Sequence, residues 1–296
     1  MNSYINIAIE STIGAFQYTL KSIVDPGMER NYFYLLLFIS MGCWALEIIF
    51  PWRKNQGKFR KDFWLDAFYM FFNLFLLYIV GYAAISNVAV ELFDNLLLKV
   101  GIENMVAISI SKSPEWIQYL IMFVVADFIH WNVHRLLHKY PLLWNFHKVH
   151  HSVTEMGFAA HLRFHWMESV IYKTLQYIPL ALIGFGLEHF FLMHIVTISI
   201  GHLNHSNLNL SYGPLKYVLN NPKMHIWHHA KKIPTGSKGV NYGISLSLWD
   251  YIFGTAYIPK DGKDIELGFT DDIDFPTTFT QQIKHPFTSK KKNREG

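Results

Sequence analysis

Residues 134–151 read HRLLHKYPLLWNFHKVHH and place five histidines within eighteen positions. In an α-helix, residues three and four positions apart share one face, so the histidines of HRLLH and those of HKVHH each converge. The motif HxxHH returns at 225–229 as HIWHH, and HLRFH (161–165) and HLNH (202–205) add pairs of similar spacing. The pattern predicts helices that turn several imidazoles toward a common point.

Clustered imidazoles of this kind indicate a metal site, because they repel one another when protonated and are stabilised by a shared cation. Imidazole suits iron, zinc, copper and nickel. A structural zinc ion has four protein ligands and a catalytic one usually three, so eight or more converging histidines predict two metal ions. The single cysteine, Cys43, argues against a disulfide framework and against a cysteine-based metal site.

The composition is that of a membrane protein. The chain is 51% hydrophobic and 16% charged, whereas soluble domains carry about 25% charged residues. Three apolar runs, at 32–50, 67–90 and 116–129, are candidate membrane spans, and two shorter runs at 177–186 and 190–201 suit a helical hairpin. We expect an all-α, polytopic integral membrane protein with four to five membrane helices and a cytoplasmic, helical, histidine-rich metal-binding cap. The net charge of +4 is too small and scattered to favour nucleic acid binding.

Lysine and arginine predict the sidedness. The loop PWRKNQGKFRK (51–61) carries five positive charges and no negative one, which places it in the cytoplasm. Following the spans from this loop brings every clustered histidine to the same side. We therefore expect an integral membrane protein of the bacterial inner membrane with cytoplasmic histidine clusters, and the endoplasmic reticulum stays open as an alternative.

The ends of the chain are expected to differ from its centre. The first residues lack the basic charges of a cleavable signal, so the first apolar segment is expected to be retained. Residues 5–23 are amphipathic and suit either the membrane interface or ordinary packing. We expect an N-terminal membrane region with two spans (1–115), a catalytic domain (116–258) and a polar, loosely ordered C-terminal tail (259–296).

The segments DFIHWNVHRLLH, HKVHH, HLRFHWMES, HIWHH and NYGISLSLWDYIFGT resemble the fatty acid hydroxylase and sterol desaturase superfamily of membrane di-iron enzymes. The resemblance covers about residues 120–258 and is greatest to the alkylglycerol monooxygenase-like branch. It implies two iron ions as cofactors and O2 as co-substrate. It implies these metal ligands: His134, His138, His147, His150, His151, His225, His228 and His229, with His161, His165 and His205 as further members. In the variable stretch His202 is an alternative to His205, and His130 is expected beside the ligands rather than among them.

Two acids are candidate catalytic residues. Asp127 lies two helical turns before His134, so its carboxylate is placed to accept the outer N–H of a ligand ring and fix its tautomer. Glu168 is a candidate for the same role, as is Glu155, and a solvated or capping role is the alternative for both glutamates.

The sequence therefore predicts an iron-dependent oxidoreductase that hydroxylates or desaturates a C–H bond of a lipid such as a fatty acyl, alkylglycerol or sterol-like molecule. The family implies an external electron donor: a reductase with a ferredoxin or cytochrome b5-like carrier, or a pterin. A zinc-dependent membrane hydrolase is an alternative, although HExxH is absent. A metal transporter is another, although it would place ligands along a mid-membrane pathway.

Overall fold

The computed structural model describes residues 2–28, 31–77, 83–102, 106, 110–183, 185, 187–270 and 272–288. Within these residues the regular structure is helical, with only isolated β-bridges between extended segments, so the predicted all-α class is confirmed. The α-helices are α1 (Asn2–Val24), α2 (Tyr32–Ile49), α3 (Phe63–Phe71), α4 (Ala83–Lys99), α5 (Glu115–Lys139), α6 (Pro141–His151), α7 (Trp166–Leu182), α8 (Leu187–His205), α9 (Pro222–His228), α10 (Leu248–Ile252) and α11 (Phe279–Thr288). A π-helical turn continues α3 (Phe72–Leu76), and 3-10 helices occupy Phe158–Leu162 and Gly213–Tyr217.

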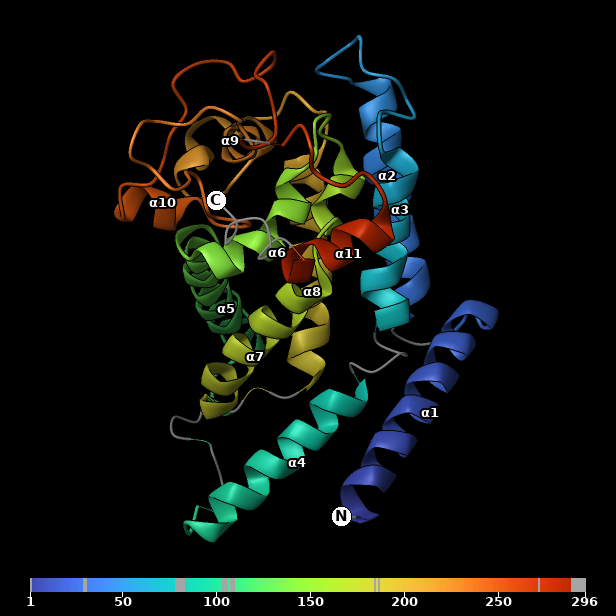
Figure 1. Ribbon diagram of the computed structural model, residues 1–296. Coiled ribbons are helices and arrows are strands. Elements are labelled where there is room, and N and C mark those ends of the chain that lie inside the picture. The colour runs from blue at the N-terminus through green and yellow to red at the C-terminus, as the bar shows by residue number, and fades with distance from the viewer. Residues whose placement is uncertain are drawn as a thin grey trace.

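The helices form a bundle with different structures at its two ends (Figure 1). Loops that carry α9 and α10 cover one end of the group α5 to α8, whereas α1 and α4 lie at the opposite end. Helix α2 runs beside α3, and it also packs on α8 and on the 3-10 helix at Phe158–Leu162. The fold therefore brings α2, α5, α6, α8 and α9 toward one covered end.

Two of the described helices are long and apolar enough to cross a membrane, α2 with 18 residues and α5 with 25. Helix α2 covers all but the last residue of the predicted span at 32–50, and α5 contains the predicted span at 116–129. Helix α2 exposes large apolar side chains over much of its length, among them Phe38, which is 77% exposed. A stretch of exposed apolar surface on a helix of spanning length is what a hydrocarbon environment requires.

The predicted continuous span at 67–90 is wrong. α3 passes into the π-helical turn and α4 begins only at Ala83, while residues 78–82 lie outside the described part. The two helices point in different directions, with α3 beside α2 and α4 beside α1 (Figure 1). An apolar run indicates that a segment lies in lipid or in a protein core, but it does not indicate where the chain changes direction.

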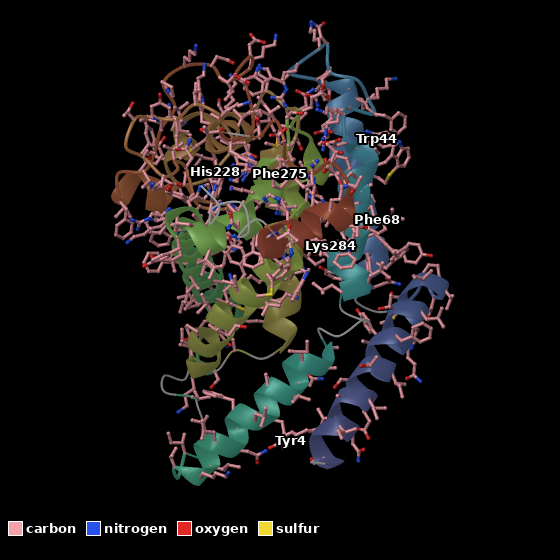
Figure 2. All side chains as sticks on the ribbon, viewed as in Figure 1. Tyr4, Trp44, Phe68, His228, Phe275 and Lys284 are labelled. Atoms are coloured by element: carbon pink, nitrogen blue, oxygen red, sulfur yellow. The ribbon has the colours of Figure 1, made fainter. Side chains whose placement is uncertain are left out.

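The pair α1 and α4 has small and polar side chains inside and apolar ones outside. Asn87 donates to Ser11 and Asn95 to the Tyr4 hydroxyl, which lies between the two helices in Figure 2. On α1 the buried residues are small, Ala15, Thr19 and Ser22, whereas its large aliphatic side chains are exposed. Small residues at the contact and apolar residues outside are typical of helix pairs in lipid. The pattern favours the membrane for α1 over packing against a soluble core.

The C-terminal segment is more ordered than its polar composition predicts. Residues 279–288 form α11, which packs on α6. The buried amide of Gln282 accepts a hydrogen bond from the Tyr69 hydroxyl at 2.9 Å and donates to the Pro276 carbonyl at 2.7 Å. The expectation of a loosely ordered tail is therefore wrong for these residues, because a few buried polar contacts anchor the helix.

Candidate metal centre

Two helices joined by a sharp turn supply the first histidines. α5 ends at Lys139, Tyr140 adopts an extended backbone, and Pro141 begins α6, where its fixed φ suits the first helical position. His134 and His138 are one turn apart near the end of α5. The histidines of HKVHH occupy the last turns of α6, and all five are buried.

The remaining histidines come from α8 and α9. His205 is the last residue of α8, and α9 is a short helix that Asn221 caps by accepting from the Met224 N–H at 3.1 Å. This cap places His225 and His228 on α9 and His229 directly after it. Segments about eighty residues apart in sequence thus meet at one point.

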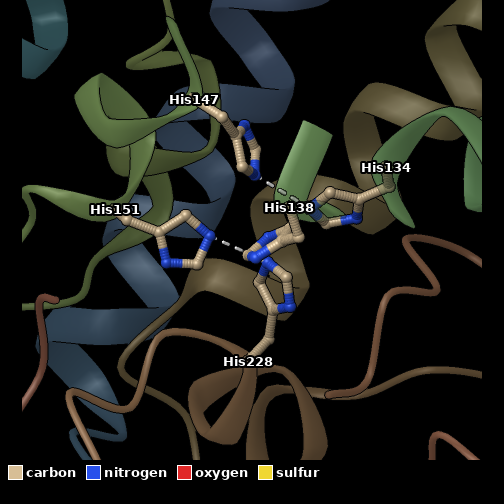
Figure 3. A group of neighbouring side chains, drawn as sticks. All are labelled: His134, His138, His147, His151 and His228. Carbon is tan, nitrogen blue, oxygen red and sulfur yellow. Dashed lines mark hydrogen bonds between the residues drawn. The ribbon is translucent and has the colours of Figure 1, made fainter. Parts of the chain in front are cut away.

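Nine histidines form two compact, buried groups. In each group, one ring nitrogen per residue lies within 4.8 Å of the corresponding nitrogen of every other member. Figure 3 shows the first group, in which rings from α5, α6 and α9 point toward one another. The first group is His134, His138, His147, His151 and His228, and the second is His150, His205, His225 and His229.

Backbone carbonyls orient most of these rings from outside. Nδ1 of five histidines lies 2.7–3.2 Å from a carbonyl oxygen. A carbonyl can only accept, so each Nδ1 carries the proton, and the Nε2 of a neutral ring presents a lone pair. The pairs are His134 with Tyr242, His138 with Lys238, His150 with Arg163, His205 with Gly201, and His228 with Val240.

Glu168 orients a sixth ring. Its Oε2 lies 2.7 Å from His147 Nδ1, and both side chains are buried. This arrangement directs the Nε2 lone pair of His147 toward His134 Nε2, 3.0 Å away. A carboxylate behind a ligand histidine is the usual partner that fixes its tautomer and raises its basicity.

The arrangement inside the groups fits a cation in each. His134 Nε2 and His147 Nε2 are 3.0 Å apart in the first group, and His150 Nε2 and His205 Nε2 are 3.3 Å apart in the second. In both pairs the outer nitrogens hold the protons, so two lone pairs face each other, which is unfavourable unless a cation lies between them. Metal–imidazole bonds of about 2.1 Å put neighbouring ligand nitrogens about 3.0–3.4 Å apart.

A buried ring nitrogen without a hydrogen-bond partner supports the same conclusion for the first group. His138 Nε2, in the first group, has no partner among the described residues. Buried polar atoms are rarely left unpaired, and a ligand atom awaiting a metal is one physical reason for such an exception.

Burial keeps these rings neutral. Desolvation lowers the pKa of each histidine of HKVHH and HIWHH well below the usual 6.5, and neighbouring imidazoles lower it further, because a second positive charge nearby is unfavourable. Neutral imidazole is the form that binds metal. The site is therefore prepared for cations near neutral pH.

Asp127 does not orient a histidine, contrary to our prediction. Its carboxylate accepts from Ser245 N at 3.1 Å, Leu246 N at 3.3 Å and Trp249 Nε1 at 2.9 Å. It therefore fixes the segment 245–249. Glu155, the other candidate acid, accepts from the Lys61 N–H at 2.9 Å, away from the histidine groups.

Two other predicted ligands, His161 and His165, lie outside both groups, and so does His130, which we expected beside the ligands rather than among them. His165 is engaged at both nitrogens, with Nε2 3.0 Å from the Ile283 carbonyl and Nδ1 accepting from Met167 N at 3.1 Å, so a ligand role does not fit its geometry. His161 lies closer, its ring 5.0 Å from that of His205, and its Nδ1 is 3.1 Å from His202 Nδ1. His130 stacks on Tyr172 at 4.2 Å.

Sequence reasoning missed Asp250. This buried carboxylate accepts from Tyr242 N and Gly243 N, and so holds the segment whose carbonyls at Val240 and Tyr242 orient two rings of the first group. The only signal was its place in NYGISLSLWDYIFGT, which contributed to the family resemblance.

Comparisons with known proteins agree with the motifs. The family described as fatty acid hydroxylase matches residues 119–255. The ornithine lipid hydroxylase OlsE of Rhizobium tropici is 34% identical over 177 residues, which are 60% of this chain and 52% of that protein. Human alkylglycerol monooxygenase is 28% identical over 56% of this chain and 36% of its own length. A very-long-chain aldehyde decarbonylase of rice, GL1-10, is 28% identical over 47% of this chain and 46% of its own length.

The matched part is thus about half or less of each of these relatives. No solved structure matches the chain.

Proposed function

The chain is a member of the fatty acid hydroxylase superfamily, a family of oxidoreductases, and from this we propose that it is a membrane di-iron enzyme that uses O2 to hydroxylate a C–H bond of a lipid. The observation that carries the proposal is the pair of buried, neutral histidine groups, each with two lone pairs opposed at 3.0–3.3 Å. Two relatives are named for hydroxylating or oxygenating lipids, ornithine lipid and alkylglycerol. Desaturation begins with the same hydrogen abstraction and is the alternative outcome.

In this proposal the five histidines of the first group hold one iron and the four of the second group hold the other. When bound, the two irons supply the activation of O2 and the oxidising power to remove hydrogen from an unactivated carbon. An all-nitrogen donor set leaves the iron charges uncompensated, which distinguishes this site from carboxylate-bridged di-iron sites in helical bundles.

The protein's own part is orientation and exclusion of water. The carbonyls behind five rings and Glu168 behind His147 hold the Nε2 atoms in place before a metal arrives, so little reorganisation accompanies binding. All nine rings are buried, which keeps bulk water from the reacting atoms.

We further propose that the covered end with α9 and α10 faces the cytoplasm, with α2 and α5 crossing the bilayer. The support is the five basic residues of 51–61, which follow α2 directly. Electrons would come from a separate donor on that side, a reductase with a ferredoxin or cytochrome b5-like carrier, or a pterin.

Metal analysis and lipidomics test the proposal together. The purified protein is expected to contain two irons per chain, whereas one zinc would favour a hydrolase and exchangeable mixed metals a transporter. Lipids of a host that expresses the wild type are compared with those of hosts expressing His150→Ala, from the second group, and His228→Ala, from the first. An oxygenated lipid present only with the wild type supports the proposal, and identical lipid profiles in all three strains would refute it.

A further inference from the structure

A cavity of about 230 Å³ opens at the end of α2, beside the loop 51–61. It lies toward the covered end of the bundle, where Figure 2 labels Trp44. Its lining includes aromatic, acidic and basic side chains, among them Trp44, Glu47, Lys54, Lys58, Phe63 and Asn207. Of these residues only Asn207, two residues from His205, lies within the family match at 119–255.

One wall of the cavity suits an ammonium group. The Oε1 atom of Glu47 accepts from Phe158 N and from Asn207 N, each at 2.8 Å, so the carboxylate is fixed in position. The rings of Trp44 and Phe63 are 5.6 Å apart and line the same cavity. A carboxylate with aromatic faces beside it is the combination that binds organic ammonium ions.

The basic residues of the loop 51–61 that line the cavity suit an acidic group of a ligand. Lys54 and Lys58 line the cavity and are exposed, and among the described residues neither has a carboxylate within ion-pair distance. Arg60 also lines it, but its guanidinium is committed to the buried carboxylate of Asp66. The cavity is thus lined by a fixed carboxylate and by two ammonium groups that have no ion-pair partner among the described residues, which matches a ligand that carries both charges.

The surface around the cavity points to a lipid rather than a soluble zwitterion. Ile49 and Phe50, at the end of α2, are 63% and 64% exposed, and Phe59 on the loop is 56% exposed. These side chains continue the apolar surface of a helix that is long enough to cross a membrane. Acyl chains can lie along this surface while a headgroup enters the cavity.

The cavity also has a direct structural connection to the metal centre. Glu47 joins the backbone of Asn207, just after the helix that ends in His205, to the backbone of Phe158, at the start of the 3-10 helix that carries His161. We propose that this cavity binds the zwitterionic headgroup of the substrate lipid, with its ammonium against Glu47 and Trp44 and its acid group against Lys54 and Lys58. The inference rests on the proposed function in taking the bound lipid as substrate.

Binding of short-chain lipids without turnover tests the inference. The full-length protein in detergent, kept free of O2, is titrated calorimetrically with dihexanoyl phosphatidylethanolamine, and with dihexanoyl phosphatidylglycerol, which lacks the ammonium. We expect the wild type to prefer the ethanolamine lipid, and Glu47→Gln to lose about tenfold or more in affinity for it, because a hydrogen bond to a charged group is removed. Affinity for the glycerol lipid should hardly change in this variant, and Lys54→Ala with Lys58→Ala should weaken binding of both lipids.

Controls separate recognition from folding. The amide oxygen introduced by Glu47→Gln can still accept from Phe158 N and Asn207 N, so iron content and thermal unfolding should match those of the wild type, as they should for Glu10→Gln on the exposed surface of α1. Equal affinity for the two lipids, or an unchanged affinity in Glu47→Gln, would overturn the inference. So would glycerophosphoethanolamine binding as tightly as the lipid, because the apolar surface would then have no part. None of these results depends on iron content or product formation, which test the proposed function.

Discussion

The carboxylate of Asp250 orients metal ligands without touching them, and Asp250→Asn measures how much that orientation contributes. Its two oxygens accept four hydrogen bonds: Oδ1 from Trp131 Nε1 at 3.0 Å, Tyr242 N at 2.9 Å and Thr255 Oγ1 at 2.6 Å, and Oδ2 from Gly243 N at 2.8 Å.

The segment held in this way reaches the first histidine group. The Tyr242 carbonyl lies 2.7 Å from His134 Nδ1, and the Val240 carbonyl 2.8 Å from His228 Nδ1. Asparagine has the same shape as aspartate but can offer only one acceptor oxygen. An NH2 group at the Oδ2 position would face the Gly243 N–H, so one hydrogen bond is lost and two donors meet.

The expected cost can be worked from this geometry. Losing a buried hydrogen bond to a charged group costs about 1.5–3 kcal/mol. Removing the partners that orient ligands typically costs about 10–100-fold in metal affinity, which is about 1.4–2.7 kcal/mol. The two ranges agree, and we expect the iron dissociation constant of the first site to rise by about 10–100-fold.

Chelator competition followed by metal analysis gives the dissociation constants. Thr255→Val removes one hydrogen bond, which the Thr255 hydroxyl donates to Asp250 Oδ1, and is expected to have a smaller effect. Asp274→Asn, at an exposed carboxylate, should behave as wild type. Circular dichroism should show the same helix content in all variants. Wild-type iron affinity in Asp250→Asn would refute the view that this segment orients the ligands.

Three further perturbations follow from the site. Gly201→Ala puts a Cβ 2.2 Å from the His161 ring, and the thermal unfolding of this variant should show a loss of about 1–3 kcal/mol from overpacking, whereas Gly42→Ala, with open space at its Cβ, should show none. Glu168→Ala should weaken iron binding more than Glu168→Gln does, because the amide oxygen can still accept from His147 Nδ1; equal losses in chelator competition would contradict this role. The metal-free protein should lose stability as the pH falls below about 6.5. Burial lowers the pKa values of the histidines on α6 and α9 in the folded state, so the unfolded chain takes up protons first. A midpoint of thermal unfolding that stays constant or rises on acidification would contradict the view that these rings are buried and neutral.

Helical spacing was enough to predict which histidines share a face. HRLLH, HKVHH and HIWHH supply eight of the nine rings in the two groups, and His205 supplies the ninth. Spacing does not say which group a ring joins. His150 and His151 are adjacent in sequence but enter different groups, because neighbouring positions on a helix point about 100° apart.

Hydropathy was informative about environment and less so about chain path. It identified α2 and the apolar part of α5, and it treated 67–90 as one span although α3 and α4 diverge. The reason is that α4 carries exposed aliphatic side chains such as Leu92 and Leu96, so its composition resembles that of a span. Its packing on α1, which includes the contact from Asn87 to Ser11, depends on residues far away in the sequence.

The partners of the buried carboxylates could not be predicted from the motifs, although the metal ligands could. Asp127 shares a helical face with His134, yet its partners are Ser245, Leu246 and Trp249, more than a hundred residues downstream. Asp250 accepts hydrogen bonds from the backbone of the preceding residues, Tyr242 and Gly243. Between them the two acids fix the backbone of 242–246, so the orientation of ligand rings depends on backbone oxygens that carry no side-chain signature.

The metal affinity of such a site should depend on the backbone conformation of the loops that orient its ligands. Residues that never contact the metal, including those in loops without a recognisable motif, control ligand orientation through carbonyls at Arg163, Gly201, Lys238, Val240 and Tyr242. A side-chain substitution at these positions leaves the carbonyl in place, whereas a change in backbone conformation moves it. Substitutions in the loop 238–243 should therefore affect metal affinity according to their backbone preferences, and least where the new residue keeps the native φ and ψ.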